Sequence, residues 1–498
     1  MKSKINNHDK NIKKLGQVFT PDFIVDFMLD SINYKGKDIL KKHVLDSSCG
    51  NGAFLKNIVK RYVKVAKGEN LSQKLIKKGL ETYIHGIEIC SIAYESCIKN
   101  LTSIFPANYD VRLEDALFVN DYNEKMDFVV GNPPYVRIHN LNTQTKKIIS
   151  QKKLKGMVNL YLLFYFLSFQ QLNASGKLIY ITPSFLKNAS GKILREKIYQ
   201  EKKLIHIYNF KHQQVFPDIT TYPIITLFAN SQTSQKFNYS VVELKINNKE
   251  KVNLISTTEF NWKEVVIENR FIFEQRFLLE SQKIFAKNQK NYCEVKNAFA
   301  TLADNIFIAD KFSFTSPNII KIVKSSTGEI KECIFPYYYD EEKKKYVLKD
   351  FDKLDKNTQD YLLTFQSQLQ ERSIKEKDKW WGFGRSQSIK DTGKNKIYVN
   401  CLFNKKVSNV NFGLVPKGMG IYGGIYILPN KTKPKTIEKH LESEKFRDFV
   451  KTFGEHRNGN WYLINSRIMN KYLNYLISLS EKKEHNTKKN NYNEDRIE

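Results

Sequence analysis

The first half of the sequence predicts an α/β fold of the doubly wound, Rossmann-like kind, with a mostly parallel sheet. Two observations support this prediction. Short apolar runs with the length of strands alternate with longer stretches of helical periodicity as far as residue 230. Glycine or acidic residues follow several of these runs, at the positions where the strands of such folds end and ligands bind.

Seven strands and five helices are expected within this region. The strands are His43–Asp46, Tyr83–Ile89, Val111–Glu114, Phe128–Gly131, Lys177–Thr182, Ile205–Phe210 and Ile224–Phe228. The helices are Asp22–Ile32, Ala53–Val65, Ile92–Ile104, Asn159–Leu172 and Lys192–Gln200.

The alternating pattern fades after Asn230, and the next ten residues are polar and have no clear periodicity. This change predicts a first domain over residues 1–240 and a second over 241–480. Residues 481–498 are charged and polar, which is typical of a frayed tail.

The second domain is predicted to be of the mixed α+β class. Leu362–Gln370 and Ile468–Leu479 have helical patterns. Gly413–Pro429 places several glycines between apolar runs, which favours hairpins.

The net charge indicates a polyanionic partner. Lys and Arg total 81 against 52 Asp and Glu, a formal net charge of +29, and both halves of the chain share the excess. Nucleic acid is the partner that such a charge favours. A coding bias toward Lys and Asn is the alternative explanation.

Several classes of protein fit poorly. Residues 1–15 are polar and basic and lack the apolar core of a secretory signal. The longest apolar run, Leu160–Phe169, is too short to span a bilayer. Six scattered cysteines without a CxxC pair argue against a zinc site or a disulfide framework and fit a reducing cytoplasm.

The most specific motif is Asn132-Pro133-Pro134-Tyr135, directly after a predicted strand. Two successive prolines make a stiff turn that supplies no backbone donor. The Asn132 side-chain oxygen and the Pro133 carbonyl can then accept the two N–H groups of an exocyclic amine, which favours a nucleophilic lone pair on its nitrogen. Tyr135 can stack on the base that carries the amine.

Polar residues follow three earlier strands in order. The turn after Asp46 contains Ser48, Gly50 and Gly52. These residues are small, so the backbone there can approach a ligand closely. Glu88 and Asp115 end the next two strands, where carboxylates accept hydrogen bonds from ribose or adenine. Neither GxGxxG nor a Gly-Lys-Ser/Thr sequence accompanies them, which argues against a pyrophosphate or triphosphate ligand.

With these motifs, residues 13–230 resemble the γ-class N6-adenine DNA methyltransferases of the TaqI type, which use S-adenosylmethionine (AdoMet). Lys14–Pro21 is similar to the family's N-terminal cofactor motif, and Asp46 stands where many relatives have Glu. The resemblance implies a cofactor site formed by Thr20, Asp46, Ser48, Gly50, Gly52, Glu88, Ile89, Asp115, Ala116, Asn132 and Phe164. It also implies that Phe216 stacks on the flipped target base opposite Tyr135, and that Asn132, Pro133 and Tyr135 form the catalytic turn.

The rest of the expected mechanism follows from this resemblance. The sulfonium of AdoMet is the leaving group, so neither a metal nor a dedicated base is required. The target adenine must leave the duplex, at a cost of a few kcal/mol. Only 86 residues separate Asp46 from Asn132, so the DNA-reading part is expected downstream, where Arg385 and Arg457 are candidate contacts to guanine or phosphate. The tryptophans beside them, Trp380, Trp381 and Trp461, are expected to be core residues.

Three alternatives remain open. The motif also suits a methyltransferase that acts on cytosine N4, on RNA adenine or on a glutamine side chain, although cytosine N4 enzymes more often carry Ser in place of Asn132. A catalytically inactive DNA-binding subunit is the second. A fused nuclease is the third, and it fits poorly because no convincing Asp…Glu-x-Lys site follows and the family motifs begin near residue 14.

The expected partner is double-stranded DNA, and the expected setting is a restriction–modification or epigenetic system in a bacterial or archaeal cytoplasm. A separate restriction endonuclease is a candidate partner, and a membrane is not expected. No stretch of the sequence has the pattern of a dimerisation helix, which favours a monomer.

Overall fold

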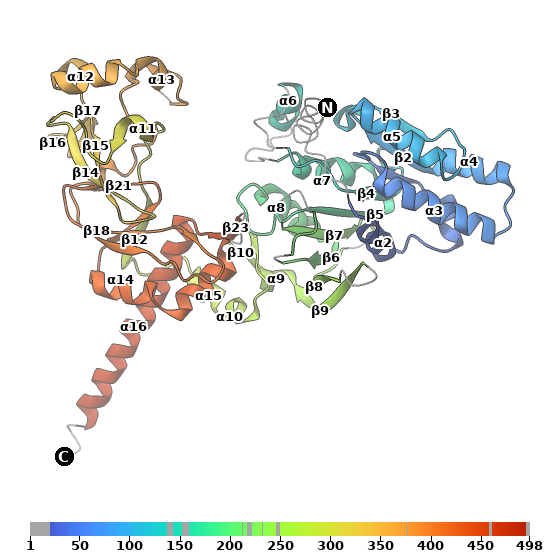
Figure 1. The fold of residues 1–498 in the computed structure, drawn as a ribbon. Helices are drawn as coiled ribbons and strands as arrows, with labels where there is room; N and C mark the ends of the chain where they lie inside the picture. Colours follow the sequence, from blue (N-terminus) through green and yellow to red (C-terminus); the bar gives the residue numbers. More distant parts are fainter. Residues whose placement is uncertain are drawn as a thin grey trace. The chain divides into compact units, whose positions relative to one another are not determined.

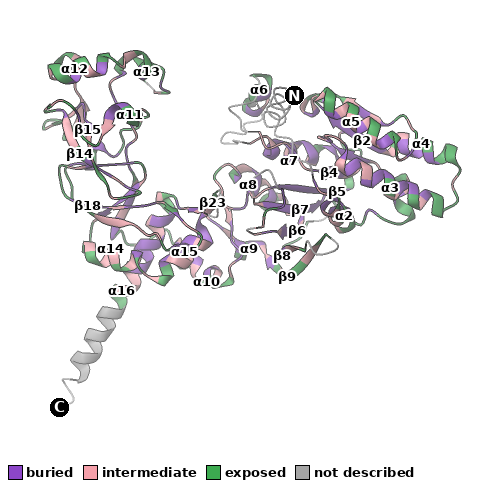
Figure 2. Ribbon diagram, in the orientation of Figure 1, coloured by how far each residue is buried: buried purple, intermediate pink, exposed green. Residues whose placement is uncertain are grey.

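A computed structural model describes residues 20–136, 143–151, 159–211, 213–216, 222–231, 233–245, 250–374, 376–457 and 461–494. The chain divides into two compact units, Met1–Phe273 and Glu274–Glu498 (Figure 1). Each unit has its own buried core (Figure 2).

The first unit contains one nine-stranded mixed sheet in the order β3-β2-β1-β4-β5-β7-β6-β8-β9. Neighbours from β3 to β5 are parallel, and β7 is antiparallel to both β5 and β6. In this order, the strands are β3 (Asp110–Leu113), β2 (Ile84–Glu88), β1 (Val44–Asp46), β4 (Met126–Gly131), β5 (Leu172–Pro183), β7 (Pro223–Ala229), β6 (Leu204–Asn209), β8 (Lys236–Lys245) and β9 (Lys251–Asn261).

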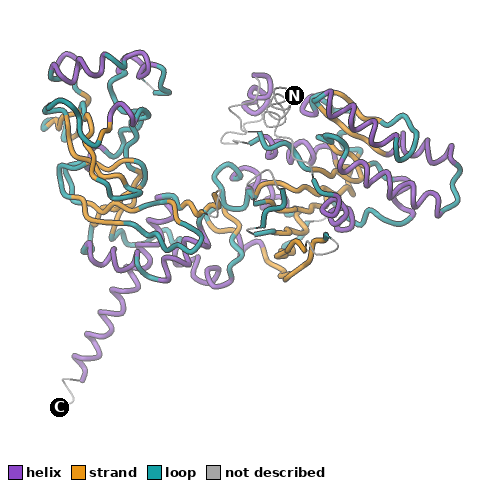
Figure 3. Tube along the Cα trace, viewed as in Figure 1, coloured by secondary structure: helices purple, strands orange, loops and turns teal. Residues whose placement is uncertain are grey.

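Helices follow the strands of this sheet (Figure 3). They are α2 (Asp22–Ser31), α3 (Ala53–Gly68), α4 (Gln73–Tyr83), α5 (Ser91–Thr102), α6 (Thr143–Gln151), α7 (Leu160–Gln171), α8 (Lys192–Glu201) and the short α9 (Trp262–Val265). Helices α2, α4 and α5 all contact α3, and α7 packs on β4 and β5. A small ladder of β10 (Val266–Ile267) and β11 (Arg270–Phe271) ends the unit.

The predicted α/β fold is confirmed, and each of the seven expected strands is present within a few residues of its predicted bounds. The expected number of strands was too low, because β8 and β9 extend the sheet. The domain boundary expected at residue 240 falls inside β8, and the compact unit ends at Phe273 instead. The hydrophobic pattern did not predict β9, because β9 is an edge strand with mostly exposed side chains and lacks a continuous apolar run.

The second unit is α+β and contains several small sheets. Their strand orders are β12-β22-β18-β20, β13-β15-β14-β21, β16-β17 and β19-β24-β23. The strands are β12 (Cys293–Asn297), β13 (Ile308–Ala309), β14 (Ile319–Lys324), β15 (Ile330–Ile334), β16 (Tyr337–Asp340), β17 (Lys345–Leu348), β18 (Lys396–Val399), β19 (Leu402–Phe403), β20 (Phe412–Val415), β21 (Gly420–Tyr422), β22 (Ile425–Pro429), β23 (Glu455–Arg457) and β24 (Trp461–Leu463).

The helices of this unit are α10 (Gln275–Ile284), α11 (Asp304–Phe307), α12 (Lys356–Leu363), α13 (Gln366–Gln370), α14 (Pro434–Leu441), α15 (Glu444–Phe453) and α16 (Ser466–Glu494). Among the described residues, no helix is both long enough and apolar enough to cross a bilayer.

Three expectations for the second unit need correction. The hairpins expected over 413–429 are absent among the described strands, because β20 and β22 pair with β18 while β21 pairs with β14. The helix expected over 362–370 is split between α12 and α13. The tail that was expected to fray from residue 481 is instead part of α16, which is helical as far as Glu494.

Candidate functional site

The carboxyl ends of four neighbouring parallel strands bring the predicted site residues to one edge of the sheet. Asp46 ends β1, Glu88 ends β2, Asp115 follows β3 and Asn132 follows β4. The order β3-β2-β1-β4 makes these strand ends adjacent. In doubly wound folds, this edge is where ligands bind.

Glu88 holds the turn between β1 and α3. Its two carboxylate oxygens accept hydrogen bonds from the backbone N–H groups of Gly50 and Cys90, each at 2.8 Å. Gly50 and Gly52 have φ values of 56° and 85°, in the left-handed region that favours glycine. A Cβ on Gly52 would lie 2.9 Å from the Cys97 sulfur, so a side chain there would displace the turn. The turn is therefore fixed before any ligand arrives.

Asp46 is the most deeply buried carboxylate of this edge, with 1% of its surface exposed. The pKa of Asp46 is raised to about 7, mainly by burial; a hydrogen bond from the Ser48 backbone N–H (3.0 Å) opposes the rise, and the charge of Glu88 adds to it. A Cβ on Gly131 would lie 2.8 Å from an Asp46 oxygen, so the backbone just before Asn132 packs directly against this carboxylate. A cation placed beside Asp46 would favour its ionised form.

Near the ends of β2 and β3, carboxylates lie close to apolar side chains that are exposed to solvent. Asp115 accepts a hydrogen bond from the Leu117 backbone N–H at 3.0 Å, and burial raises its pKa. Ala116 beside it is buried, whereas Ile89 is 56% exposed and Phe118 49% exposed. Apolar side chains that face solvent next to a hydrogen-bond acceptor suit a planar heterocycle with an amino group.

The Asn-Pro-Pro-Tyr turn is attached to the rest of the unit at three points. Asn132 Nδ2 donates to Thr20 Oγ1 at 3.1 Å, and Thr20 is itself buried. Val136, which follows the turn, accepts a hydrogen bond from the Leu160 backbone N–H at 2.8 Å, at the start of α7. The Tyr135 hydroxyl donates to the Ile181 carbonyl in β5 at 3.4 Å. The bond to Thr20 fixes the plane of the Asn132 amide, and with it the direction of the amide oxygen.

Aromatic rings surround Tyr135 edge-on. Its ring centroid is 6.5 Å from that of Phe216 with an interplanar angle of 69°, and 6.2 Å from that of Tyr161 at 78°. Phe216 is only 2% exposed and belongs to the apolar core of the unit. The predicted pair is thus brought together, but the two rings do not form an open parallel slot. Phe216 would have to turn before it could stack on a base.

The loop after β5 contains residues that the sequence analysis did not single out. Tyr161 is hydrogen-bonded to Asn188. Asn188 in turn donates to the Ser184 carbonyl at 2.9 Å and accepts from the Gly191 N–H at 2.8 Å. Arg195 is 3% exposed and donates to the Phe185 carbonyl, which ties α8 to the same loop. The Asn-x-x-Gly spacing is the signal that could have indicated this turn.

The remaining predicted residues occupy different settings. Phe164 lies on α7 and is 5% exposed. Arg385 and Arg457 are exposed and belong to the second unit, where Arg457 pairs with Glu455 at 3.1 Å. Trp380 is buried, as expected for a core residue, and its ring packs against Phe351 at 5.0 Å. Residues 14–19 of the N-terminal motif lie outside the described residues.

Comparison with known proteins shows which family this edge is similar to. Residues 53–216 match the model of the Eco57I restriction-modification methylase family. This segment, about a third of the chain, is similar to that family. It contains Glu88, Asp115, the Asn-Pro-Pro-Tyr turn and Phe216. The resemblance to DNA methyltransferases of restriction–modification systems is thereby confirmed.

The chain is similar to several type II methyltransferases. M.AccI of Acinetobacter calcoaceticus is 28% identical over 237 residues, which cover 46% of this chain and 40% of the relative. M.BstVI of Geobacillus stearothermophilus is 25% identical over 345 residues, covering 59% and 60%. RM.Eco57I of Escherichia coli, a combined restriction enzyme and methyltransferase, is 28% identical over 288 residues, covering 45% and 29%. The alignments therefore span less than two thirds of these relatives.

Solved structures share the fold over most of the chain. The restriction–modification enzyme MmeI in complex with DNA has a TM-score of 0.61 at 14% identity, covering 90% of this chain and 64% of that one. A nuclease-deletion mutant of LlaGI with a DNA substrate mimic has a TM-score of 0.54 at 13% identity, covering 92% and 46%. At these identities the likeness concerns the fold alone.

Proposed function

We propose that the protein is a site-specific DNA adenine-N6 methyltransferase of a restriction–modification or epigenetic system. Its substrates would be AdoMet and an adenine flipped out of double-stranded DNA. The observation that carries the proposal is the Asn-Pro-Pro-Tyr turn, held by Thr20 and by the start of α7 beside the carboxylate edge. The Eco57I family match over residues 53–216 supports it.

The residues of the edge fit AdoMet by their chemistry. Asp46 and the turn with Gly50 would hold the cationic methionine part, and Glu88 would accept from the ribose hydroxyls. The backbone N–H groups of Gly50 and Cys90, which donate to its two oxygens, hold the Glu88 carboxylate in a fixed direction for this contact. Asp115 would accept from the adenine amino group, and Ile89 would cover the ring with apolar surface. When bound, AdoMet supplies an electrophilic methyl group.

The turn would act on the target amine by orientation and electrostatics. The Asn132 oxygen and the Pro133 carbonyl would accept its two N–H groups, so that the lone pair points out of the plane of the base. Acceptors held in place before the reaction need no reorganisation in the transition state. Because Asn132 is fixed by Thr20 at 3.1 Å, its acceptor direction is set by the fold and does not depend on the substrate.

Asn132 favours adenine over the alternatives, because cytosine N4 methyltransferases more often carry Ser at this position. The second unit and the net charge of +29 favour DNA over a small protein substrate. We further propose that the second unit reads the recognition sequence, that the enzyme acts as a monomer, and that any restriction endonuclease is a separate protein.

The decisive experiment is expression in a host that lacks DNA methylation, followed by single-molecule sequencing of its genome. We expect N6-methyladenine at one short sequence motif and at no other. N4-methylcytosine at a motif would reassign the target base. An unmodified genome, with AdoMet binding intact by calorimetry, would instead identify an inactive DNA-binding subunit.

Substitution of Phe216 tests whether its ring stacks on the flipped target base. Phe216→Leu keeps an apolar side chain in the core but removes the aromatic face, and stacking on a base contributes about 1–3 kcal/mol. We therefore expect a smaller fluorescence increase from DNA with 2-aminopurine at the target position and a KM for DNA raised about 5- to 150-fold.

Phe210→Leu is the matched control, because Phe210 is fully buried in the same core. It should alter stability without altering the fluorescence increase. An increase in Phe216→Leu equal to that of the wild type would exclude the stacking role.

A further inference from the structure

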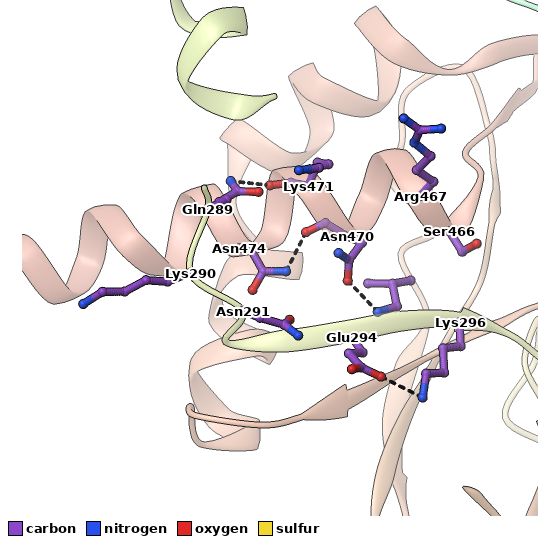
Figure 4. Close-up of a pocket in the computed structure, with 11 residues that line it drawn as sticks. Gln289, Lys290, Asn291, Glu294, Lys296, Ser466, Arg467, Asn470, Lys471 and Asn474 are labelled. Carbon is purple, nitrogen blue, oxygen red and sulfur yellow. Dashed lines mark hydrogen bonds and ion pairs between the residues drawn. The ribbon is translucent and has the colours of Figure 1, made fainter. Parts of the chain in front are cut away.

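Asparagines of α16 fix β12, the edge strand of a four-stranded sheet in the second unit (Figure 4). Asn470 Oδ1 accepts from the Val295 N–H at 2.8 Å, and Asn474 Oδ1 accepts from the Cys293 N–H at 3.0 Å. The cavity of about 440 Å³ beside them is thus bordered by a joint between helix and sheet. The other three strands of this sheet, β22, β18 and β20, belong to one basic segment of the chain.

This basic segment, residues 392–437, contains no acidic residue, although 52 of the 498 residues of the chain are Asp or Glu. It includes β18 to β22 and reaches the first turn of α14. Its eight lysines are Lys394, Lys396, Lys405, Lys406, Lys417, Lys431, Lys433 and Lys435. Charge of a single sign over such a stretch favours a polyanionic ligand.

Two of these lysines serve the fold, and the other six are exposed. Lys396 is 3% exposed, and its ammonium group donates to the carbonyls of Asp391 and Lys394 at 3.0 and 2.9 Å. Lys394 pairs with the buried carboxylate of Asp391 at 3.0 Å. A ligand can therefore reach only the exposed lysines, of which Lys405 and Lys406 are adjacent in one loop.

Asparagine side chains hold this loop, residues 400–411, between β18 and β20. Asn400 Nδ2 donates to the carbonyls of Leu402 and Asn409 at 2.8 and 2.9 Å. Asn404 Oδ1 accepts from the Ser408 N–H at 3.0 Å, and the Asn404 N–H donates to Asn409 Oδ1 at 2.8 Å. These amide groups satisfy the backbone of the loop itself. The charged groups that the loop offers to a ligand are its two lysines.

Val407, which directly follows the two lysines, has an unusual backbone conformation. Its φ is 54°, in the left-handed region that a β-branched residue rarely adopts, and its side chain is fully buried. Backbone strain of this kind persists only where the surrounding structure imposes it, and it is concentrated at functional sites. The position of Lys405 and Lys406 is therefore set by the fold before any ligand binds.

The charges of Lys405 and Lys406 are not neutralised within the fold. Their side chains have no hydrogen bond or ion pair among the described residues. Each ammonium group brings three N–H donors. Two exposed ammonium groups on a loop do not enclose a small anion, whereas they can contact phosphates along a nucleic-acid chain.

The loop begins beside Arg457 and Trp461, which the sequence analysis singled out. Phe403 in β19 lies opposite Tyr462 in β24. One residue further along, Trp461 in β24 lies opposite Arg457 in β23. Because Asn404 follows Phe403, the loop starts at the level of Trp461 and Arg457. Arg457 is exposed there, although it is paired within its own strand.

We propose that the loop of residues 400–411 binds the phosphodiester backbone of double-stranded DNA through Lys405 and Lys406. The proposal rests on the DNA-methyltransferase function proposed above and adds to it a backbone contact in the second unit. Such contacts position a protein on the duplex and contribute affinity, but they do not read the sequence. DNA held there would also lie beside Arg457.

The test uses the full-length protein and the double variant Lys405→Ala, Lys406→Ala. DNA affinity is measured by fluorescence anisotropy as a function of salt concentration. Each phosphate contact contributes about 0.9 to the slope of log K against log salt, so we expect the slope to fall by about 2. We expect the Kd for DNA to rise about 10- to 60-fold at about 0.1 M salt, equally for cognate and unrelated duplexes.

The matched control removes two exposed lysines that have acidic neighbours in the same unit, Lys311→Ala and Lys321→Ala. Lys311 follows Asp310 in the sequence, and Lys321 lies opposite Glu332 between β14 and β15. This control should keep the wild-type slope, and the Tm should match the wild type in both variants. Lys405→Arg with Lys406→Arg should restore the slope, because both charges are kept.

A slope unchanged in the alanine variant, or lowered equally in the control, would overturn the DNA contact. A slope lowered for single-stranded RNA but not for duplex DNA would also overturn it. Methyl transfer is measured separately with saturating DNA at low salt. A wild type that transfers no methyl group refutes the proposed function and leaves the salt slope to decide the role of the loop.

Discussion

Replacing Asn132 with alanine should lower the kcat of methyl transfer by about 10²–10³-fold, the loss typical of removing one preorganised electrostatic group. The amide oxygen of Asn132 is the acceptor that the proposed mechanism aims at the target amine. Alanine leaves Pro133 in place but removes that acceptor from the transition state. The Kd for AdoMet should change little, because the carboxylates that would hold the cofactor remain.

Single-turnover kinetics with labelled AdoMet and calorimetry on the same preparation measure the two quantities. Thr20→Val is a milder substitution for comparison with Asn132→Ala, because it removes only the hydroxyl that accepts from Asn132 Nδ2 at 3.1 Å. A single hydrogen bond contributes about 1 kcal/mol, so we expect roughly a fivefold loss of kcat from the freer amide. Near-normal kcat in Asn132→Ala would remove the argument for the catalytic turn.

The central sheet was predictable because its strands are buried on both faces. Val44–Asp46 and Pro223–Ala229 are buried at every position, and such strands appear in the sequence as continuous apolar runs. Lys251–Asn261 lies at the edge of the sheet with mostly exposed side chains, and its mixed sequence gave no comparable signal. In the second unit, β22 pairs with β12 from more than a hundred residues earlier, and no local pattern encodes such a partner.

The position of the candidate site in the fold was predictable where its residues lie at the ends of strands. Asp46, Glu88 and Asn132 each follow an apolar run directly, so their shared edge follows from the fold class. Contacts across strands were not predictable. The approach of Gly131 to Asp46 depends on β4 lying beside β1, and the burial of Phe216 depends on packing from several distant elements.

The burial of Asp46 gives the stability of the protein a pH dependence with a definite sign. The pKa of Asp46 in the folded protein, about 7, lies above the ordinary value of 3.8 because the carboxyl is buried beside Glu88. The folded state therefore holds a proton between about pH 4 and 7 that the unfolded state has lost. In the absence of ligand, the contribution of Asp46 to the free energy of unfolding should decrease as the pH rises through this window.

Binding of AdoMet should show the opposite trend. The cofactor is cationic, so it favours the ionised carboxylate, and below about pH 7 its binding must expel the proton from Asp46. We expect the Kd for AdoMet to rise toward tenfold for each pH unit below 7, about 100-fold between pH 7 and 5, measured by calorimetry.

Asp46→Asn separates this carboxyl from every other titrating group, because an amide of similar shape cannot ionise. The variant should bind AdoMet more weakly at pH 8, and its Kd should vary little between pH 5 and 8. The difference in Tm between wild type and variant should change with pH in the same window. If the wild-type Kd for AdoMet is flat with pH, the cationic group does not lie beside Asp46. The cofactor would then have to be held by Glu88 and Asp115 alone.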